Sequence, residues 1–485
     1  MGRSAFLYAG FLKNLGFDPT SCQDRFFREF SEFVTSDEDL MVINGYAGTG
    51  KTTALACVIR TLDFYRINCV LLAPTGRAAK VLSGFAGRPA FTVHKSIYRQ
   101  KSFGADGFGE FSLAPNEMKD TLFIVDEASL VGVDSQGQST ASFGSGNLLE
   151  DLVTFVRSGR GCKMVLCGDA AQLPPVGQEL SLALNHDYMV MLGATRFVSL
   201  QTVVRQKGES GILWNATRLR EMIMAGHEDL FDFIPSDETV PLSQLGLRAE
   251  GFPDVERIGG GELIETLTDA LDRYGDDETV VLCRSNRRAN RYNAGIRASV
   301  QFKEERLVRG DKLMIVKNCY QFIESLEGLD YLANGDIAEL VRISRYEERY
   351  GLHFAEARLS LPDYGGQEFV AKVILDTLDS ESPSLTYDQQ NALYLGVNAD
   401  YAHIKNKRKR YSAVREDHYF NALQLKYANA ITCHKSQGGQ WKCVFVDNPF
   451  WQDDLQAEDL KWLYTAITRG VEKVYLVNFK DENFA

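Results

Sequence analysis

The sequence predicts an α/β protein with two parallel-sheet domains and a small β-barrel inserted into the second of them. Three observations support this fold class. An apolar run at Met41 leads through a glycine-rich turn into a helical pattern, and later apolar runs each end in a polar cluster. A second α/β pattern starts at Val280 and is interrupted from about residue 311 to 425 by short alternating runs, which are typical of a small barrel.

The composition narrows the class of protein. A chain of 485 residues has room for about three domains, and 45% hydrophobic residues are enough for ordinary cores. The net charge is −12, so a polyanionic partner must be held by a local basic surface. Nine scattered cysteines without a C-x-x-C pair fit neither a disulfide framework nor a zinc site, which favours a reducing cytosol. We expect no membrane association, because no apolar run reaches the length of a span and residues 6–12 are too short for a secretory signal.

The first motif is a strand, a glycine-rich turn and a helix around residues 41–62. The turn has the pattern G-x-x-x-x-G-K-[ST], in which the backbone curls so that its N–H groups point at a phosphate. Lys51 brings a positive charge to the β- and γ-phosphates, and Thr52 offers a hydroxyl to Mg²⁺. ATP and Mg²⁺ are therefore the expected cofactors, with a phosphate-binding loop made of Gly45, Ala47, Gly48, Thr49, Gly50, Lys51, Thr52 and Thr53.

Before this loop the chain reads as helical, with an aromatic stripe at Phe26, Phe27, Phe30 and Phe33 that is most simply core. Gln23 lies about twenty residues upstream of the loop, and its amide carries both donors and an acceptor. The side chain could therefore reach the edge of adenine or belong to the core.

Polar residues follow the next two predicted strands. The strand at residues 69–72 ends in Pro74, Thr75 and Arg77, which suit contact with the backbone of a ligand. The strand at 122–125 ends in Asp126 and Glu127. Asp126 can hold Mg²⁺ through water, while Glu127 can orient and deprotonate the attacking water.

The fourth strand of the first half, residues 164–167, precedes a loop with two prolines. Within this loop Gln172 has the chemistry of a γ-phosphate sensor that also touches the attacking water. Arg205 then follows a short apolar run. In the second half, Arg469 lies where a helix could present its guanidinium to the same site, so two domains would close one nucleotide site.

Three further segments have alternative interpretations. Turn residues 104–107 between Phe103 and Phe108 predict an exposed hairpin that carries aromatic side chains, and this hairpin is either functional or decorative. Residues 132–147 read as a flexible loop. Lys405 to Arg410 contains five positive charges in six residues, which fits a solvated loop or a phosphate contact.

These patterns predict the following domain boundaries: a first domain at 1–235 with a small hairpin at about 93–118, a linker at 236–261, a second domain at 262–310 and 425–485, and an inserted barrel at 311–424.

The order of the motifs resembles the superfamily 1 DNA helicases of the RecD-like and Dda-like branch. The most specific matches are residues 45–52, 126–129, 168–175, 432–438 and 464–469. The resemblance implies two RecA-like P-loop motor domains that move 5′ to 3′ on single-stranded DNA. It also implies a small wedge in the first domain and an SH3-like insert in the second.

The resemblance assigns roles to single residues. Gln23 would read adenine, and Arg205 and Arg469 would be arginine fingers. Gln440 stands where the family often has a glutamate that meets the ribose, so recognition of the sugar is in doubt. The residues expected to touch the DNA strand are Pro74, Thr75, Arg77, Thr92, His94, His434 and Ser436, with Phe108 of the hairpin as the separating wedge at a junction of single and double strands.

Two classes of function remain at this point. The first is a translocating helicase, and the second is an ATP-gated DNA-binding subunit of a RecD-type complex whose nuclease is another protein. Repair or replication proteins would be its partners. A chain that unwinds a tailed duplex unaided favours the first class.

Overall fold

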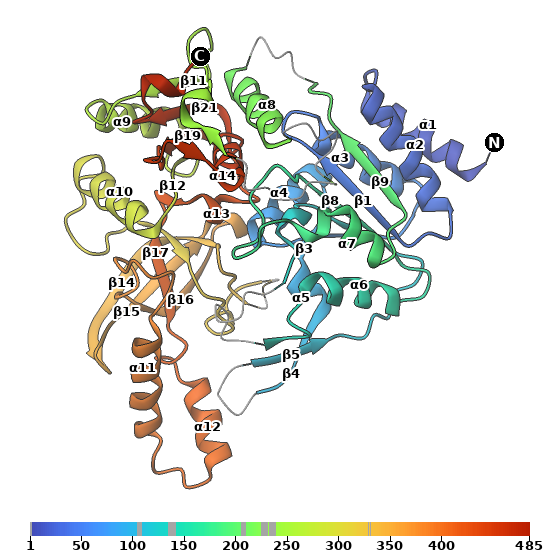
Figure 1. Cartoon of the computed structure of the whole chain (residues 1–485). Helices are drawn as coiled ribbons and strands as arrows, with labels where there is room; N and C mark the ends of the chain where they lie inside the picture. Colours follow the sequence, from blue (N-terminus) through green and yellow to red (C-terminus); the bar gives the residue numbers. More distant parts are fainter. Residues whose placement is uncertain are drawn as a thin grey trace.

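The computed structural model describes residues 2–103, 109–133, 142–204, 210–224, 231, 239–327, 329 and 331–485. Two parallel sheets form separate lobes, and a barrel lies beneath the second lobe (Figure 1). This arrangement confirms the predicted fold class. In the part of the chain described, none of the helices combines the length and the apolar character that a bilayer crossing requires.

The first sheet contains six strands, and every neighbouring pair is parallel. The four apolar runs that the sequence marks as buried strands all lie in it. Because the carboxyl ends of parallel strands meet at one edge, the polar clusters that follow these strands gather there. In spatial order the strands are β3 (Ala90–Thr92), β2 (Cys69–Ala73), β6 (Leu122–Val125), β8 (Lys163–Gly168), β1 (Leu40–Gly45) and β9 (Arg196–Leu200).

Helices flank this sheet. The aromatic stripe of the second helix is core, since Phe27, Phe30 and Phe33 are fully buried together with Phe11 of the first helix. The helices are α1 (Arg3–Leu15), α2 (Ser21–Thr35), α3 (Lys51–Phe64), α4 (Gly76–Ala86), α5 (Val93–Ile97), α6 (Leu148–Ser158) and α7 (His186–Met191). The next helix, α8 (Gly211–Met224), packs instead on the second lobe, against α14 (Ala457–Ile467).

The predicted hairpin of the first domain is present. It consists of β4 (Tyr98–Phe103) and β5 (Gly109–Leu113), which pair antiparallel. The segment expected as a loop at 132–147 contains a short strand, β7 (Ser142–Phe143), because these two residues pair with β5 and widen the hairpin to three strands. Phe108, the expected wedge residue, lies outside the described residues.

The second sheet has five strands, and its neighbours are also all parallel. In spatial order they are β11 (Val255–Ile258), β21 (Gly470–Val477), β19 (Trp441–Asp447), β12 (Thr279–Cys283) and β18 (Ala430–Thr432). The helices of this lobe are α9 (Leu263–Tyr274), α10 (Asn286–Ser299), α13 (Cys433–Ser436) and α14 (Ala457–Ile467).

The linker expected at 236–261 is wrong in part. Its residues 255–258 form the edge strand β11, with Val255 and Ile258 buried against the sheet. A second short strand, β10 (Val240–Pro241), pairs with β20 (Asp454–Leu455). The sequence pattern does not predict these strands. Glycines and charged residues surround them, and only two apolar side chains mark an edge strand of four residues.

The inserted barrel is closed, as predicted. Its strands are β13 (Lys312–Ile315), β14 (Ile337–Arg349), β15 (Leu352–Leu361), β16 (Gln367–Ile374) and β17 (Leu423–Tyr427). The expected boundary at 424 therefore falls inside β17, which still belongs to the barrel.

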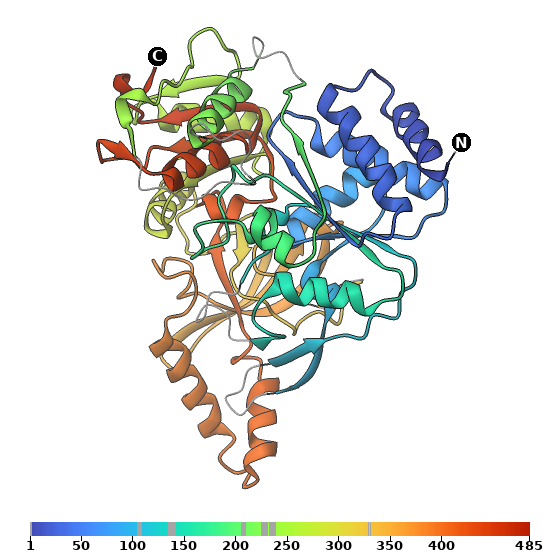
Figure 2. The same cartoon turned by 45° about the vertical axis from the view of Figure 1, so that its right-hand side comes forward.

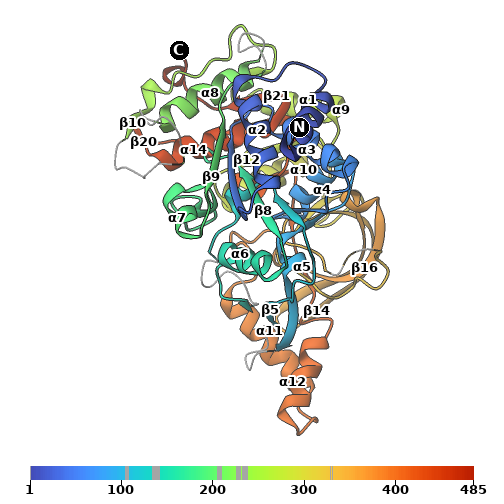
Figure 3. The same cartoon turned by 90° about the vertical axis from the view of Figure 1, so that its right-hand side faces the viewer.

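Two helices project from the barrel between β16 and β17, and the sequence analysis did not predict them. They are α11 (Tyr387–Asp400) and α12 (Lys407–Glu416). The basic run at 405–410 thus begins a helix and is not a loop, because the Asn406 side chain accepts the Lys409 N–H and caps the first turn. These helices and the hairpin of the first domain project at the same end of the molecule (Figures 1, 2 and 3).

Candidate functional site

The phosphate-binding loop connects β1 to α3. Gly48 and Gly50 have φ angles of 75° and 76°, which are open to glycine and strained for other residues. A Cβ at Gly50 would lie 2.6 Å from Nε2 of Gln23, and one at Gly48 would lie 2.6 Å from a methyl of Leu213. The loop therefore needs glycine at both positions, and it leaves the N-terminus of α3 open to an anion.

Lys51 faces the two predicted carboxylates. Its Nζ is 3.4 Å from Oδ1 of Asp126. Burial opposes the charge of Lys51, but the carboxylates of Asp126 and Glu127 outweigh burial and raise the pKa of the lysine. The lysine is thus kept protonated, as a phosphate ligand must be.

Three buried oxygens of the predicted site residues make no hydrogen bond among the described residues, and one of them, Oδ1 of Asp126, has only the ion pair with Lys51. They are Oδ1 of Asp126, Oε2 of Glu127 and Oε1 of Gln172, and all three are buried. An unpaired buried acceptor costs about 1–3 kcal/mol, so such a cluster indicates a ligand. Carboxylate and amide oxygens fit a hydrated Mg²⁺ and an attacking water, with Thr52 and Asp126 as the residues that would hold the ion.

Glu127 has an unusual backbone. Its φ and ψ angles are 53° and 36°, in the left-handed region that side chains rarely adopt. Such a conformation costs about 1–3 kcal/mol and persists where the surrounding structure imposes it. The strain lies at the residue that the sequence predicts as the general base.

The second lobe reaches the phosphate-binding loop through α14. The hydroxyl of Tyr464 accepts the N–H of Ala47 at 2.9 Å and donates to Oδ2 of Asp169 at 2.7 Å. Thr465, the next residue, accepts the N–H of Leu173 at 2.9 Å. Burial raises the pKa of Asp169, and the hydrogen bond from Tyr464 works against that rise. One helix of the second lobe therefore contacts both loops of the nucleotide site.

Gln23 and Arg469 already have protein partners in this structure. The Gln23 side chain completes a capping box with Thr20 and donates to the carbonyl of Thr49 at 3.1 Å, on the phosphate-binding loop itself. The guanidinium of Arg469 is buried and donates to the carbonyls of Thr465 and Gly439, both at 3.1 Å. These two bonds hold the guanidinium against α14 and the backbone at Gly439.

The structure places one of the other two expected nucleotide contacts, Gln440, and that residue does not lie at the phosphate-binding loop. Arg205 lies outside the described residues. Gln440 is exposed and lines a different cavity of 560 Å³, together with Arg77 and Lys312.

Five of the expected DNA contacts line a single cavity of 320 Å³. They come from both lobes, and the barrel adds the turn at Asn334 and Gly335. Lys435 and Gln437 complete the second-lobe wall. The five predicted residues are Pro74, Thr75, Arg77, His94 and His434.

The cavity is cationic and partly screened from solvent. Arg77 lies over the ring of Trp441 at 4.0 Å, and Lys435 donates to Oδ1 of Asn334 at 2.6 Å. Burial lowers the pKa of His94 to about 4 and that of Lys435 to about 8. His94 is therefore neutral near pH 7, while Lys435 is charged there and loses its charge as the pH rises through about 8.

Thr92 and Ser436 make other contacts. Thr92 caps α5 by accepting the N–H of Lys95 at 3.3 Å, and its hydroxyl is 3.0 Å from that of Tyr331 in the barrel. Ser436 is buried and donates to the carbonyl of Cys433 at 2.7 Å. Both residues position neighbouring backbone in this structure.

Several contacts between the lobes have no signal in the sequence. Tyr464 lies in the motif at 464–469. Nothing in the sequence distinguishes a tyrosine that contacts the other lobe from one that belongs to a core. Gln437 donates to the carbonyl of Leu173 at 2.6 Å and also lines the 320 Å³ cavity. Asn334 and Gly335 carry no signal of such a role, since their place in the cavity depends on how the barrel docks.

Two family models match the chain. One described as an AAA domain matches residues 27–229, and one described as a UvrD-like helicase C-terminal domain matches residues 427–477. The first contains the phosphate-binding loop and the acidic pair, and the second contains α14 and the second-lobe wall of the cavity.

Curated relatives agree with these matches. The ATP-dependent RecD2 DNA helicase of Deinococcus radiodurans is 32% identical over 235 residues, which are 47% of this chain and 28% of that protein. The chain thus spans less than a third of this relative's length. The ATP-dependent DNA helicase dda of Enterobacteria phage T4 is 22% identical, and the match covers 95% of this chain and 99% of that protein. Among solved structures, a Pif1 helicase is 16% identical with a TM-score of 0.49, covering 97% of this chain and 94% of that one.

We predict that Glu127→Gln still binds ATP but hydrolyses it at least about 10²-fold more slowly, because an amide can position water but cannot accept its proton. Steady-state ATPase and nucleotide binding would be measured side by side. Glu117→Gln, at an exposed acid, is the matched control. A loss smaller than about tenfold in the Glu127 variant would show that another group is the base.

Proposed function

Since this chain belongs to the superfamily 1 DNA helicases of the RecD-like and Dda-like branch, we propose that it uses ATP hydrolysis to move 5′ to 3′ along single-stranded DNA and to unwind duplexes. One observation supports this most strongly. Gln437 donates to the carbonyl of Leu173, the residue next to the proposed γ-phosphate sensor Gln172, and also lines the cationic cavity. A single side chain thus connects the proposed nucleotide site to the proposed DNA site.

The proposed hydrolysis uses residues from both lobes. The glycine-rich loop and Lys51 bind the phosphates, and Glu127 takes the proton of the attacking water. Mg²⁺, held by Thr52 and Asp126, would neutralise charge on the phosphates. Arg469, with Arg205, would stabilise the charge that develops in the transition state.

Coupling between the lobes follows from the contacts of α14 and α13. Asp169 and Leu173 lie on the loop after β8, and they are held by Tyr464 and Thr465 of the second lobe. A change in the bound nucleotide that shifts this loop therefore shifts the second lobe and the wall that Gln437 contributes to the cavity. Such a shift is what a motor needs in order to step.

The hairpin is the proposed wedge. Phe111 of β5 packs against Tyr320 of the barrel with ring centroids 5.5 Å apart, and Tyr320 packs against Tyr331 at 5.3 Å. The hairpin is therefore braced from its base. An aromatic at its tip, of which Phe108 is our first choice, would stack on the last base pair for about 1–3 kcal/mol.

We predict that the protein separates a duplex with a 5′ single-stranded tail in the presence of ATP, and leaves a duplex with a 3′ tail intact. Strand separation would be followed by fluorescence. Lys51→Ala is the control without ATP turnover, and Phe108→Ala tests the wedge, since it should lose unwinding and keep ATPase activity.

A preference for the 3′ tail would contradict the proposed direction. Failure to separate either duplex, with DNA-stimulated ATPase intact, would favour an ATP-gated DNA-binding subunit that acts through a partner.

We predict that affinity for single-stranded DNA falls between pH 7 and pH 9, because Lys435 loses its charge as the pH rises through its pKa of about 8. Loss of a charged hydrogen bond to phosphate should weaken binding by about tenfold. Lys435→Arg keeps the charge and should remove most of this dependence, while Lys13→Arg on α1 should leave it unchanged. The same pH profile in the parent protein and in Lys435→Arg would show that Lys435 does not contact the strand.

A further inference from the structure

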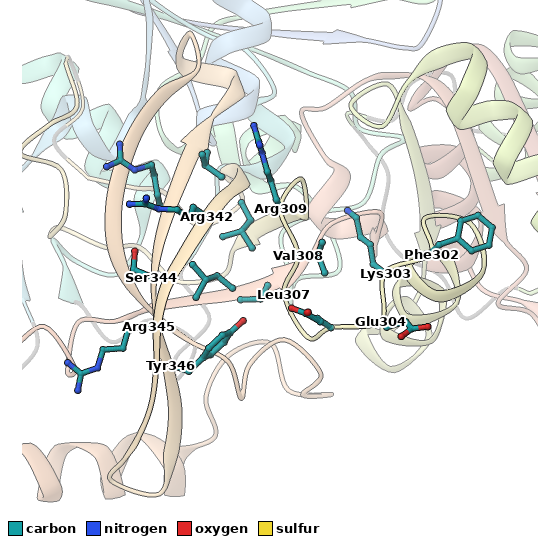
Figure 4. Close-up of a pocket in the computed structure, with 15 residues that line it drawn as sticks. Phe302, Lys303, Glu304, Leu307, Val308, Arg309, Arg342, Ser344, Arg345 and Tyr346 are labelled. Atoms are coloured by element: carbon teal, nitrogen blue, oxygen red, sulfur yellow. The ribbon is translucent and has the colours of Figure 1, made fainter.

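A third cavity, of 980 Å³, lies on the barrel between β14 and the segment at 302–309 (Figure 4). Residues 340–346 of β14 all line it, without a gap. The pairing of β14 with β15 shifts register between Leu340 and Arg342 and again between Ile343 and Arg345, so the faces do not alternate strictly along this stretch. The cavity runs along the edge of β14 that β13 leaves unpaired.

This edge is open. β13 pairs with β14 only at residues 337–339, and Leu340 makes the last backbone bonds, with Gly310 and Asp311. Within the described ranges, no backbone hydrogen bond joins β14 beyond Leu340 to the segment at 302–309. An open edge presents N–H donors and C=O acceptors in alternation, and it is a template for another strand.

The walls of the cavity are mainly cationic. Five cations line it against two carboxylates, Glu304 and Glu305, in a chain whose net charge is −12. Lys303 is paired with Asp311 at 3.0 Å and Arg358 with Glu368 at 3.3 Å. Among the described residues, Arg309 and Arg342 form no ion pair with a carboxylate, whereas Arg345 lies opposite Glu356 on β15 and interacts electrostatically with Glu347.

Arg342 also faces a like charge. It lies directly opposite Arg358 in the pairing of β14 with β15. Like charges at directly opposed positions of a sheet are destabilising, and an anion beside them would relieve the repulsion. Arg358 is already paired with Glu368, so Arg342 is the cation of this pair that an acidic occupant would meet.

The two sides of the strand differ in character. In Figure 4, Arg342 and Arg345 project on one side of the ribbon, whereas Tyr346 and Leu307 lie on the other side. Phe302 stands at the far rim, 82% exposed with a φ of 53°. A strand added to this edge would meet arginines on one face and apolar side chains on the other.

We propose that the edge of β14 binds an acidic, extended peptide of a partner protein by strand addition. Backbone bonds to the edge would supply affinity, and alternating carboxylate and apolar side chains would supply specificity. A nucleic-acid backbone fits less well. It offers the edge C=O groups no donors in return, whereas a peptide backbone supplies both donors and acceptors along the edge.

The test uses a fluorescein-labelled peptide of about eight residues in which glutamate and valine alternate, long enough to span residues 340–346. Two matched probes have lysine in place of glutamate, or N-methyl groups on alternate residues that remove the donors. Anisotropy would report binding, and hydrogen exchange would report protection of residues 341–346. The acidic probe should bind and protect this segment, and both matched probes should bind at least about tenfold more weakly.

The double variant Arg342→Glu/Arg345→Glu should weaken the acidic probe by about tenfold or more, since two attractive cross-strand pairs become repulsive. Lys13→Glu/Arg25→Glu, at exposed cations of α1 and α2, is the charge-matched control and should leave binding unchanged. Equal binding of the N-methylated probe would overturn strand addition. Absence of binding by the acidic probe, or its displacement from this segment by an oligonucleotide that itself protects residues 341–346, would overturn the peptide proposal.

Discussion

The contact between the hydroxyl of Tyr464 and the nucleotide site is the constraint on which the arrangement of this molecule depends. The hydroxyl accepts the N–H of Ala47 and donates to Asp169, so one buried oxygen joins α14 to the phosphate-binding loop and to the loop after β8. A buried carboxylate is costly unless it is hydrogen-bonded, and Asp169 receives this bond from the other lobe. The two sheets are therefore linked where a nucleotide would bind.

Other buried oxygens of the nucleotide site, in contrast to the Tyr464 hydroxyl, make no hydrogen bond within the described part of the chain. Glu127 and Gln172 each keep a buried acceptor without a hydrogen bond among the described residues, Oδ1 of Asp126 has only its ion pair with Lys51, and Glu127 is held in a strained backbone conformation. Folding alone does not favour such a cluster. The hydroxyl of Tyr464 hydrogen-bonds the site on the side of the second lobe, whereas these acceptors on the phosphate side make no hydrogen bond with any residue that the structure describes. This arrangement is prepared for a ligand that both lobes then contact. One hydrogen bond connects the cationic cavity to this site: Gln437, in the cavity wall, donates to the carbonyl of Leu173.

The sequence predicted those parts of the fold that depend on local patterns. The strand before Lys51 and the acids after residue 125 could be placed because a buried strand ends in a cluster with specific chemistry. Strand β11 could not, since only Val255 and Ile258 mark it. The helix at 407–416 was hidden because its first turn is basic and opposes the helix dipole. Contacts such as that of Tyr464 with Asp169 depend on docking of the two lobes, which no local pattern encodes.

The central claim is that the second lobe senses the nucleotide through Tyr464. Tyr464→Phe removes only the hydroxyl and keeps the buried ring, so the most direct measurement is its ATPase rate with and without single-stranded DNA, beside its affinity for ATP. Our account predicts that ATP still binds and that stimulation by DNA falls about tenfold or more, the loss expected when a buried carboxylate is left without its donor. Stimulation equal to that of the parent protein would contradict the account.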